Sequence, residues 1–225
     1  MPTVNAETLN TIAAYALPIL LAITVHEAAH GYAARYFGDT TAAMLGRLTL
    51  NPLKHIDPLG TILIPLLLYF ATSGHFVFGY AKPVPINTRH LRNPKRDMIW
   101  IALAGPMSNL VQALAWGVIW LLLYSIHQQN SFVVLMTQAG MTFNLVLWAL
   151  NLFPLPPLDG GRVLQALLPW KQAQFLYRIE PFGFFIVLGL VLTGIMNTYW
   201  LAPLISLGND LIGLVLSPLV FLLMS

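Results

Sequence analysis

The stretch Thr24-Val-His-Glu-Ala-Ala-His-Gly31 lies inside the first long apolar run of the chain, residues 9–37. If this run is a helix, His26 and His30 lie four residues apart on one face. Two imidazoles at that spacing can share one metal ion. Glu27 lies about 100° further round the helix, where its carboxylate can reach a water on that metal. The stretch therefore predicts a membrane helix that carries a metal site.

Two other interpretations of this stretch are open. The pattern could arise by chance, or its three polar side chains could hold membrane helices together. However, an ionisable residue at the midplane of a membrane costs about 2.5–3.5 kcal/mol. The whole chain has only eight acidic residues, so placing one between two histidines in an apolar run has little structural motive. The metal site is the preferred interpretation.

The composition places the chain in a membrane. Hydrophobic residues make up 57% of its 225 positions and charged residues 8%, and the mean hydropathy is +0.72. A soluble domain carries about 25% charge. The apolar residues form runs near 9–37, 59–72, 98–126, 132–153, 182–196 and, less distinctly, 201–223. We expect an all-α polytopic membrane protein of about five to six membrane helices.

The polar connections are too short for an independent folded domain, so residues 1–225 are predicted to form a single membrane-embedded domain. The chain has no cysteine, so a metal would have to use histidine and carboxylate ligands. The basic residues do not gather into a nucleic-acid-binding patch. Nucleic acid is therefore not an expected partner.

The positions of the lysines and arginines predict the orientation. All eleven lie in three groups: Arg35, Arg47 and Lys54; Lys82, Arg89, Arg92, Lys95 and Arg96; and Arg162, Lys171 and Arg178. By the positive-inside rule these groups are cytoplasmic and the N-terminus is outside. Residues 59–81 have basic flanks on both sides, so they must cross an even number of times or re-enter.

Two segments break the helical pattern. Pro83 and Pro85 impose extended geometry, which predicts a short re-entrant extended segment near residues 75–87. Irregular backbone at membrane depth requires protein or a hydrated cavity beside it. Near the end of the chain, Asn209 and Asp210 interrupt the last apolar run. We prefer an external turn there over a polar pair inside the bundle.

A third metal ligand is expected from the segment Asn151-Leu-Phe-Pro-Leu-Pro-Pro-Leu-Asp-Gly-Gly161. Its prolines end the fourth apolar segment and its glycines permit close approach to another element. The predicted topology brings Asp159 to the same cytoplasmic depth as the two histidines. Asp159 could instead cap the helix that begins near Gly161, but the shared depth favours the ligand.

The chain resembles the site-2 protease family of intramembrane zinc metalloproteases, in particular its compact bacterial-type members without a PDZ domain. The resemblance covers most of residues 20–170 and rests on separate motifs in the same order. These are HEAAH at 26–30, GPMSN at 105–109 and NLFPLPPLDGG at 151–161, with NPLKHIDPLG at 51–60 and GYAKPVPIN at 79–87 in the same style.

The resemblance implies a role for individual residues. His26, His30 and Asp159 would bind one Zn²⁺ per chain, Glu27 would be the general base and acid, and Asn151 would hold the substrate carbonyl or oxyanion. Residues with a possible substrate or packing role are Asn109, His55, Lys82, Pro83, Val84 and Pro85. The catalytic core would span about 9–170, followed by C-terminal helices at about 181–225.

The resemblance also implies a function. The chain would be a multi-pass protein of a bacterial or archaeal cell membrane, with its active site toward the cytoplasm, and it would hydrolyse peptide bonds in or near the transmembrane segments of membrane-anchored substrates. The alternatives are a metal-ion or proton transporter and a catalytically silent zinc-binding scaffold. No inverted repeat supports the transporter, and a scaffold has no use for the glutamate.

Overall fold

The computed structural model describes residues 6–224 except 56, 65–66, 68–81 and 128–130, and over these residues the chain contains helices and no strand. The long helices are α1 (Ala6–Tyr36), α4 (Pro94–Ser125), α5 (Ser131–Asn151), α7 (Trp170–Leu192) and α8 (Ala202–Met224). The short elements are α2 (Thr41–Met44), α6 (Asp159–Leu167), the 3₁₀ turns η1 (Pro52–Lys54) and η3 (Thr88–His90), and the π-helical turns η2 (Pro58–Leu63) and η4 (Asn197–Leu201).

Five helices among the described residues are long and apolar enough to span a membrane, which confirms the predicted all-α polytopic class. They cover Leu9–Tyr36, Pro94–Ser125, Ser131–Asn151, Trp170–Leu192 and Asn197–Leu223. Between 17% and 39% of the residues in the most apolar window of each are buried inside the protein. Most of their apolar surface therefore faces outward, as expected of helices that contact lipid.

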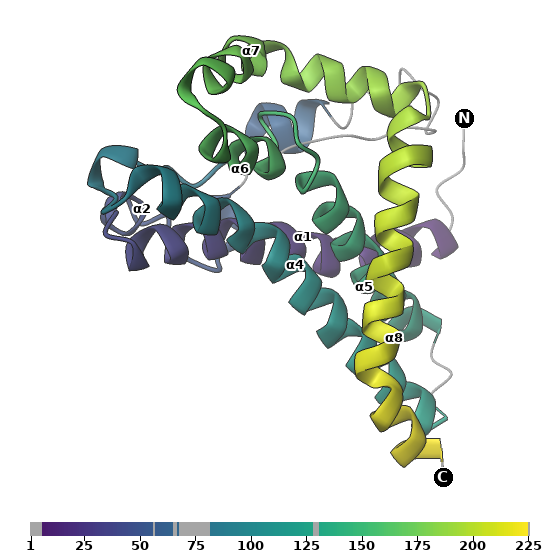
Figure 1. The fold of residues 1–225 in the computed structure, drawn as a ribbon. Helices are drawn as coiled ribbons and strands as arrows, with labels where there is room; N and C mark the ends of the chain where they lie inside the picture. The colour runs from purple at the N-terminus through teal and green to yellow at the C-terminus, as the bar shows by residue number, and fades with distance from the viewer. Residues whose placement is uncertain (1–5, 56, 65–66, 68–81, 128–130, 225) are drawn as a thin grey trace.

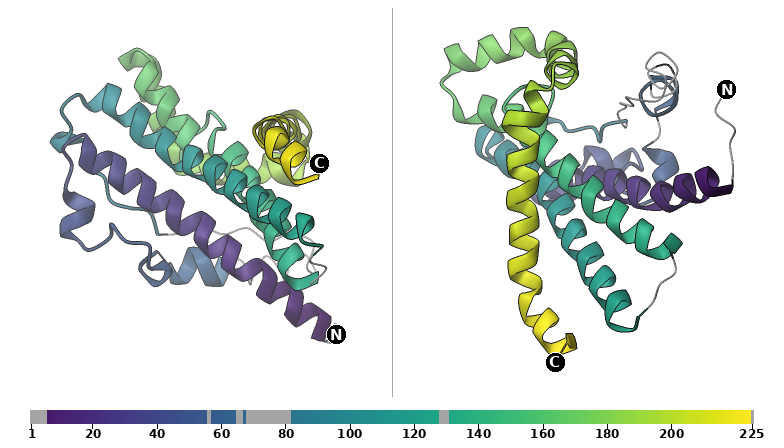
Figure 2. Two further views of the ribbon diagram at one scale, coloured as in Figure 1. Left: turned by 90° about the horizontal axis from the view of Figure 1, so that it is seen from below. Right: turned by 90° about the vertical axis from the view of Figure 1, so that its right-hand side faces the viewer.

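Helix α4 is the centre of the fold and packs against α1, α5, α6 and α8. Its first half lies against α1, where Ile101 and Asn109 contact the histidines, and beyond this crossing the two helices diverge, as the right view of Figure 2 shows. Gly140 lets α5 approach α4 closely, because a Cβ at this position would lie 2.5 Å from Cδ2 of Trp116. Small residues at such crossings let helix backbones come together. The main core, shared by α4, α5 and α8, comprises Ala113, Leu145, Trp148, Ala149, Ile212 and Leu216.

A proline-rich loop joins α5 to α6 and directs the chain back onto α4. Helix α6 packs against both α4 and α7 and lies between them in Figure 1. The backbone of α7 touches the loop directly, because a Cβ on Gly183 would lie 1.8 Å from the carbonyl oxygen of Pro156. The loop that precedes Asp159 is thus held from the side by a long helix.

The C-terminal third differs from the sequence prediction in two places. Helix α7 begins at Trp170, well before the predicted apolar segment at 182, because residues 171–180 include good helix formers such as lysine, glutamine, alanine, arginine and glutamate, most of which a hydropathy criterion excludes. The predicted turn at Asn209 and Asp210 is wrong. Helix α8 continues through both residues, which are exposed on its surface, because neither residue type stops a helix in the way that proline does.

The predicted re-entrant segment falls mostly outside the described residues, which omit 68–81. Its last part, residues 82–87, has no regular secondary structure, as the proline pattern predicts. We call residues 82–87 the strap. It runs beside α1, because Val84 contacts Glu27 of that helix.

Candidate metal centre

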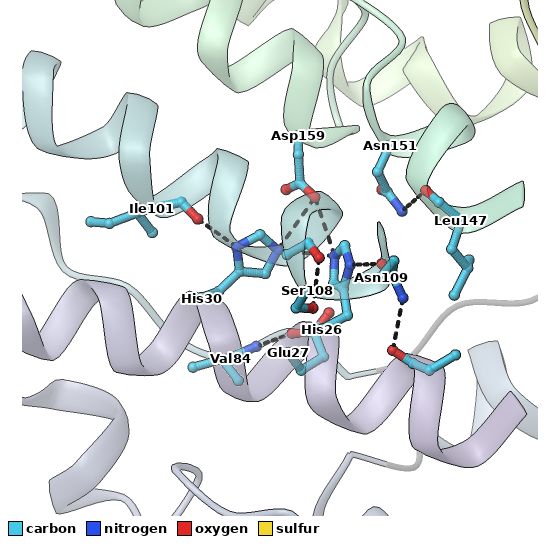
Figure 3. A network of polar contacts seen from close by, with 12 residues as sticks. His26, Glu27, His30, Val84, Ile101, Ser108, Asn109, Leu147, Asn151 and Asp159 are labelled. Atoms are coloured by element: carbon cyan, nitrogen blue, oxygen red, sulfur yellow. Dashed lines mark hydrogen bonds and ion pairs between the residues drawn. The ribbon is translucent and has the colours of Figure 1, made fainter. Parts of the chain in front are cut away.

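Two histidines of α1 and the first residue of α6 meet in the interior of the protein. His26, His30 and Asp159 are 7%, 4% and 5% exposed. The Nε2 atoms of the two histidines are 3.0 Å apart, and Oδ2 of Asp159 lies 3.2 Å from Nε2 of His26 and 3.3 Å from Nε2 of His30. Figure 3 shows Asp159 pointing down from α6 toward the two imidazoles.

The hydrogen bonds of the imidazoles fix their neutral tautomers. Nδ1 of His26 donates to Oδ1 of Asn109 at 2.6 Å, and Nδ1 of His30 donates to the carbonyl oxygen of Ile101 at 2.7 Å. Both partners are acceptors, so each Nδ1 carries the hydrogen, and in the neutral imidazole each Nε2 then presents a lone pair. This is the arrangement of metal-binding histidines, whose second nitrogen is held by an outer partner.

The three inward-facing atoms fit a zinc ion. Zinc–ligand distances of about 2.0–2.2 Å in a tetrahedral site place neighbouring ligand atoms about 3.3 Å apart. The observed separations of 3.0–3.3 Å match this value. Oδ2 of Asp159 also accepts no hydrogen bond from the described residues, and three facing acceptors repel one another unless a cation lies between them. Among the described residues, this is the group of histidine and carboxylate side chains that could hold a metal ion.

An amide network stands behind His26. Nδ2 of Asn109 donates to the carbonyl oxygen of Ala22 at 3.1 Å and to Oδ1 of Asn144 at 2.9 Å, and Nδ2 of Asn144 donates to the carbonyl oxygen of Gly140 at 2.9 Å. Both asparagines are fully buried. Both acceptors of Asn109 in this network lie on the Nδ2 side of its amide, so the amide is oriented with its Oδ1 toward His26.

Glycines allow the elements that carry the cluster to meet. A Cβ on Gly105 of α4 would lie 2.4 Å from Nε2 of His30 and 2.6 Å from Cε1 of His26. At the start of α6, a Cβ on Gly160 would lie 2.2 Å from the carbonyl oxygen of Leu152. Only a residue without a side chain fits at either position.

Glu27 points toward the strap rather than toward α4. The backbone N–H of Val84 donates to its Oε2 at 2.8 Å. Glu27 is half-buried, and Figure 3 places its carboxylate close below the two histidines. A carboxylate beside a metal site in this position can exchange protons with a water there.

The strap is anchored at both ends by charged or polar groups. At its start, the N–H of Lys82 donates to the carbonyl oxygen of His55 at 2.9 Å, and Nη2 of Arg47 donates to the carbonyl oxygen of Lys82 at 2.9 Å. At its end, the N–H of Asn87 donates to Oδ2 of Asp39 at 2.7 Å. The strap is therefore held by three hydrogen bonds at its two ends, while its middle contacts Glu27.

Asp39 is a buried carboxylate just beyond the end of α1. It accepts hydrogen bonds from the backbone N–H and the hydroxyl of Thr41 and from the N–H of Asn87, and it pairs with Nδ1 of His90 at 3.2 Å. Burial raises the pKa of Asp39, but the hydrogen bonds from Thr41, Asn87 and His90 outweigh it and hold the pKa below its ordinary value.

Comparison with known proteins identifies the family. The chain is 38% identical over 200 residues to the Bacillus subtilis (strain 168) protein named "Putative zinc metalloprotease YwhC", and the match covers 86% of each chain. It is 30% identical over 185 residues to the Mycolicibacterium smegmatis protein named "Putative zinc metalloprotease Rip2", covering 80% of this chain and 67% of that protein. The sequence pattern of peptidase family M50 matches residues 125–194.

The chain belongs to peptidase family M50. This confirms the resemblance to site-2 proteases drawn from the motifs. A second Rip2 protein, from Mycobacterium tuberculosis (strain ATCC 25618 / H37Rv), is 29% identical over 202 residues that cover 85% of this chain and 74% of that protein. No solved structure matches the chain.

The predicted site residues of this M50 member fall into two groups. His26, His30 and Asp159 form the cluster, and Glu27 adjoins it. Asn151 lies at the end of α5, where its Nδ2 donates to the carbonyl oxygen of Leu147 at 3.0 Å, so one N–H of the amide is already engaged.

The other predicted residues lie around the cluster. Asn109 contacts His26 directly, and its place is behind the metal ligands. His55 is 2% exposed, and its Nε2 donates to the carbonyl oxygen of Thr49 at 2.9 Å. Lys82, Pro83, Val84 and Pro85 belong to the strap.

Sequence reasoning missed Asn144, Gly105 as a close-contact position, and Asp39. A buried amide in the apolar run 132–153 was a signal for Asn144, since polar side chains inside membrane helices usually have partners on other helices. Gly105 stands within the GPMSN motif, but its contact with the histidines depends on the crossing of α1 and α4. Nothing in the sequence singles out Asp39.

Proposed function

We propose that this M50 family member is an intramembrane zinc metalloprotease that hydrolyses peptide bonds in or near the transmembrane segments of membrane-anchored proteins. The observation that carries the proposal is the buried cluster of His26, His30 and Asp159, with Glu27 beside it. The two histidines lie on α1, which is long and apolar enough to span a membrane. The relatives named as zinc metalloproteases support it.

Each polar group of the site has a proposed role. A zinc ion held by His26, His30 and Asp159 would supply Lewis-acid chemistry, polarising a peptide carbonyl and lowering the pKa of water. Glu27 takes a proton from the attacking water and delivers it to the leaving amine. The second N–H of the Asn151 amide, for which the described residues show no acceptor, would donate to the substrate oxygen as negative charge develops there.

The substrate is proposed to bind along the strap. A transmembrane helix hides its carbonyl groups in its own hydrogen bonds, so a substrate must unwind before it is cleaved. A groove of about 590 Å³ lies between the strap and helices α4, α6 and α7. Its walls include Val84 and Ile86 of the strap, Met98 of α4 and Trp170 of α7. An unwound segment could pair with the strap by β-augmentation.

The first test is cleavage of a single-span substrate by detergent-purified protein, comparing wild type with Glu27→Gln and measuring bound zinc in both. We expect about one zinc per chain in each protein, and a loss of at least about 10³-fold in cleavage for Glu27→Gln, because the amide cannot accept a proton. Cleavage by Glu27→Gln at the wild-type rate would refute the role of Glu27.

The same proteins separate the protease from the alternatives. In sealed vesicles, a transporter would carry metal ions or protons across the membrane without cutting any substrate. A silent scaffold would bind zinc and do neither. Zinc binding together with cleavage that requires Glu27 is the outcome that only the protease predicts.

A further inference from the structure

The strap contributes one backbone hydrogen-bond donor to the carboxylate of Glu27. The N–H of Val84 lies 2.8 Å from Oε2 of Glu27, although the two residues are 57 positions apart in the sequence. Val84 is 5% exposed, so water has little access to the bond. A bond from an N–H to a charged oxygen is roughly twice as strong as a neutral one. Figure 3 shows this contact at the lower edge of the site.

The segment that carries this N–H is also held by contacts that do not involve Glu27. Lys82 and Asn87 are fixed by their own hydrogen bonds to His55 and Asp39. Pro83 and Pro85 restrict the backbone on both sides of Val84. The donor is thus presented from a prearranged segment, and the carboxylate is the flexible partner that it orients.

The side chain of Val84 adds a second point of contact with α1. A Cβ on Gly31 would lie 3.2 Å from Cγ1 of Val84 and 2.9 Å from Cδ1 of Leu48. Gly31 lies four residues after Glu27, on the same face of α1. The strap therefore rests on the Glu27 face of the helix, while His26 and His30 face α4 and α6.

We propose that the backbone N–H of Val84 is a positioning group for Glu27. The strap then has two roles, since it binds the substrate and orients the carboxylate that acts as the base. This inference rests on the proposed function, because it assumes that Glu27 is the base. A shift of the strap at Val84 would break or redirect this bond, so occupation of the groove beside Val84 would be coupled to the geometry of proton transfer.

The first test measures hydrogen exchange and needs no activity. Prolines on both sides leave Val84 as the single amide hydrogen of residues 83–85. We expect this amide to exchange about tenfold or more faster in Glu27→Ala than in Glu27→Gln, because glutamine keeps an acceptor oxygen and alanine does not. The amide of Asn87, whose acceptor is Asp39, is the internal reference and should not change. Equal exchange of Val84 in the two variants would overturn the contact.

The second test replaces the Val84 residue by its α-hydroxy analogue, which exchanges the N–H for an ester oxygen and keeps the side chain. A positioning role predicts that kcat falls about tenfold while KM and bound zinc stay within about twofold. If the N–H only anchors the strap for substrate binding, KM rises and kcat is unchanged, and the proposal fails. Should wild type cleave no substrate, the proposed function fails instead, and the exchange experiment still decides whether Val84 holds Glu27.

Discussion

Two acceptors on α4, Oδ1 of Asn109 and the carbonyl oxygen of Ile101, decide which nitrogen of each histidine is available to a metal. Without them, His26 and His30 could rotate or adopt the other tautomer, and a buried imidazole in the wrong tautomer presents a hydrogen to the metal position. The bond from His26 is 2.6 Å long and is backed by Asn144. At the scale of single residues, the metal affinity of this chain therefore depends on groups that never touch the metal.

The first prediction at this scale concerns Asn109. Asn109→Ala should weaken zinc binding by about 10–100-fold, the usual effect of removing an outer partner of a metal ligand. Competition with a zinc chelator measures the affinity. The control is the neighbouring Ser108→Ala, since Oγ of Ser108 donates to the carbonyl oxygen of Gly105 within α4, and it should stay within about twofold of wild type. Unchanged affinity in Asn109→Ala would show that the tautomer of His26 is set in another way.

The second prediction concerns Asp39 and pH. Its folded-state pKa is lowered, so its stabilising contribution is present above the unfolded pKa of about 3.9 and is lost as the pH falls through the folded value. Asp39→Asn should therefore lower the melting temperature at pH 7, with a loss of about 1–3 kcal/mol. The difference from wild type should shrink below about pH 4. A gap that is the same at pH 7 and pH 3 would contradict the assigned role of the charge.

At the scale of elements, the site depends on two approaches that are closer than side chains normally allow, one between α1 and α4 and one between α6 and the loop that precedes it. Gly105 of α4 faces both histidines of α1, and Gly160 of α6 faces the backbone of Leu152. At each of these two positions, a side chain would overlap the neighbouring element, and glycine leaves the space for it. The helix crossings, and not the loops alone, thus set the distances among the three ligand atoms.

The prediction at this scale is that Gly105→Ala disrupts the metal site. Its Cβ would meet the imidazoles at 2.4–2.6 Å, which forces α1 and α4 apart or turns the histidines, at a cost of about 1–3 kcal/mol. We expect bound zinc in the purified protein to fall severalfold. Gly189→Ala in α7 is the matched control, because its Cβ would meet no described atom within 4 Å beyond the adjoining backbone of its own helix and alanine favours a helix. Full zinc occupancy in Gly105→Ala would argue against this close approach.

The sequence was sufficient for the elements whose pattern is local. The two histidines of HEAAH at 26–30 are four residues apart, which by itself predicts that they share one face of a helix. The prolines and glycines around Asp159 likewise predict an irregular segment from the local sequence alone. It was insufficient where a partner decides the outcome. Asn144 matters because α4 lies across α5, and residues 170–181 form a helix although their hydropathy does not suggest one. The strap contact with Glu27 joins residues 57 positions apart, and no local pattern contains it.

At the scale of the whole molecule, five candidate spans give a definite arrangement of the connections. If the basic groups are cytoplasmic, α1 enters from outside, α4 leads out, α5 returns, α7 leads out and α8 returns. The connection between α4 and α5 and the one between α7 and α8 then lie outside. The metal centre, near the end of α1 and the start of α6, lies toward the cytoplasmic side.

This arrangement is the last prediction, and the absence of cysteine from the chain makes it directly testable. We expect single cysteines at His127 and Thr193, both exposed, to react in intact cells with a maleimide that cannot cross the membrane. A cysteine at Gln172, exposed at the start of α7, should react only after the cells are permeabilised, and wild type gives the unlabelled background. Labelling of Gln172→Cys alone in intact cells would invert the orientation and place the metal centre toward the outside. If only His127→Cys is labelled in intact cells, α5 brings the chain inside and α7 does not cross the membrane, whereas labelling of His127→Cys and Gln172→Cys without Thr193→Cys would mean that α5 does not cross.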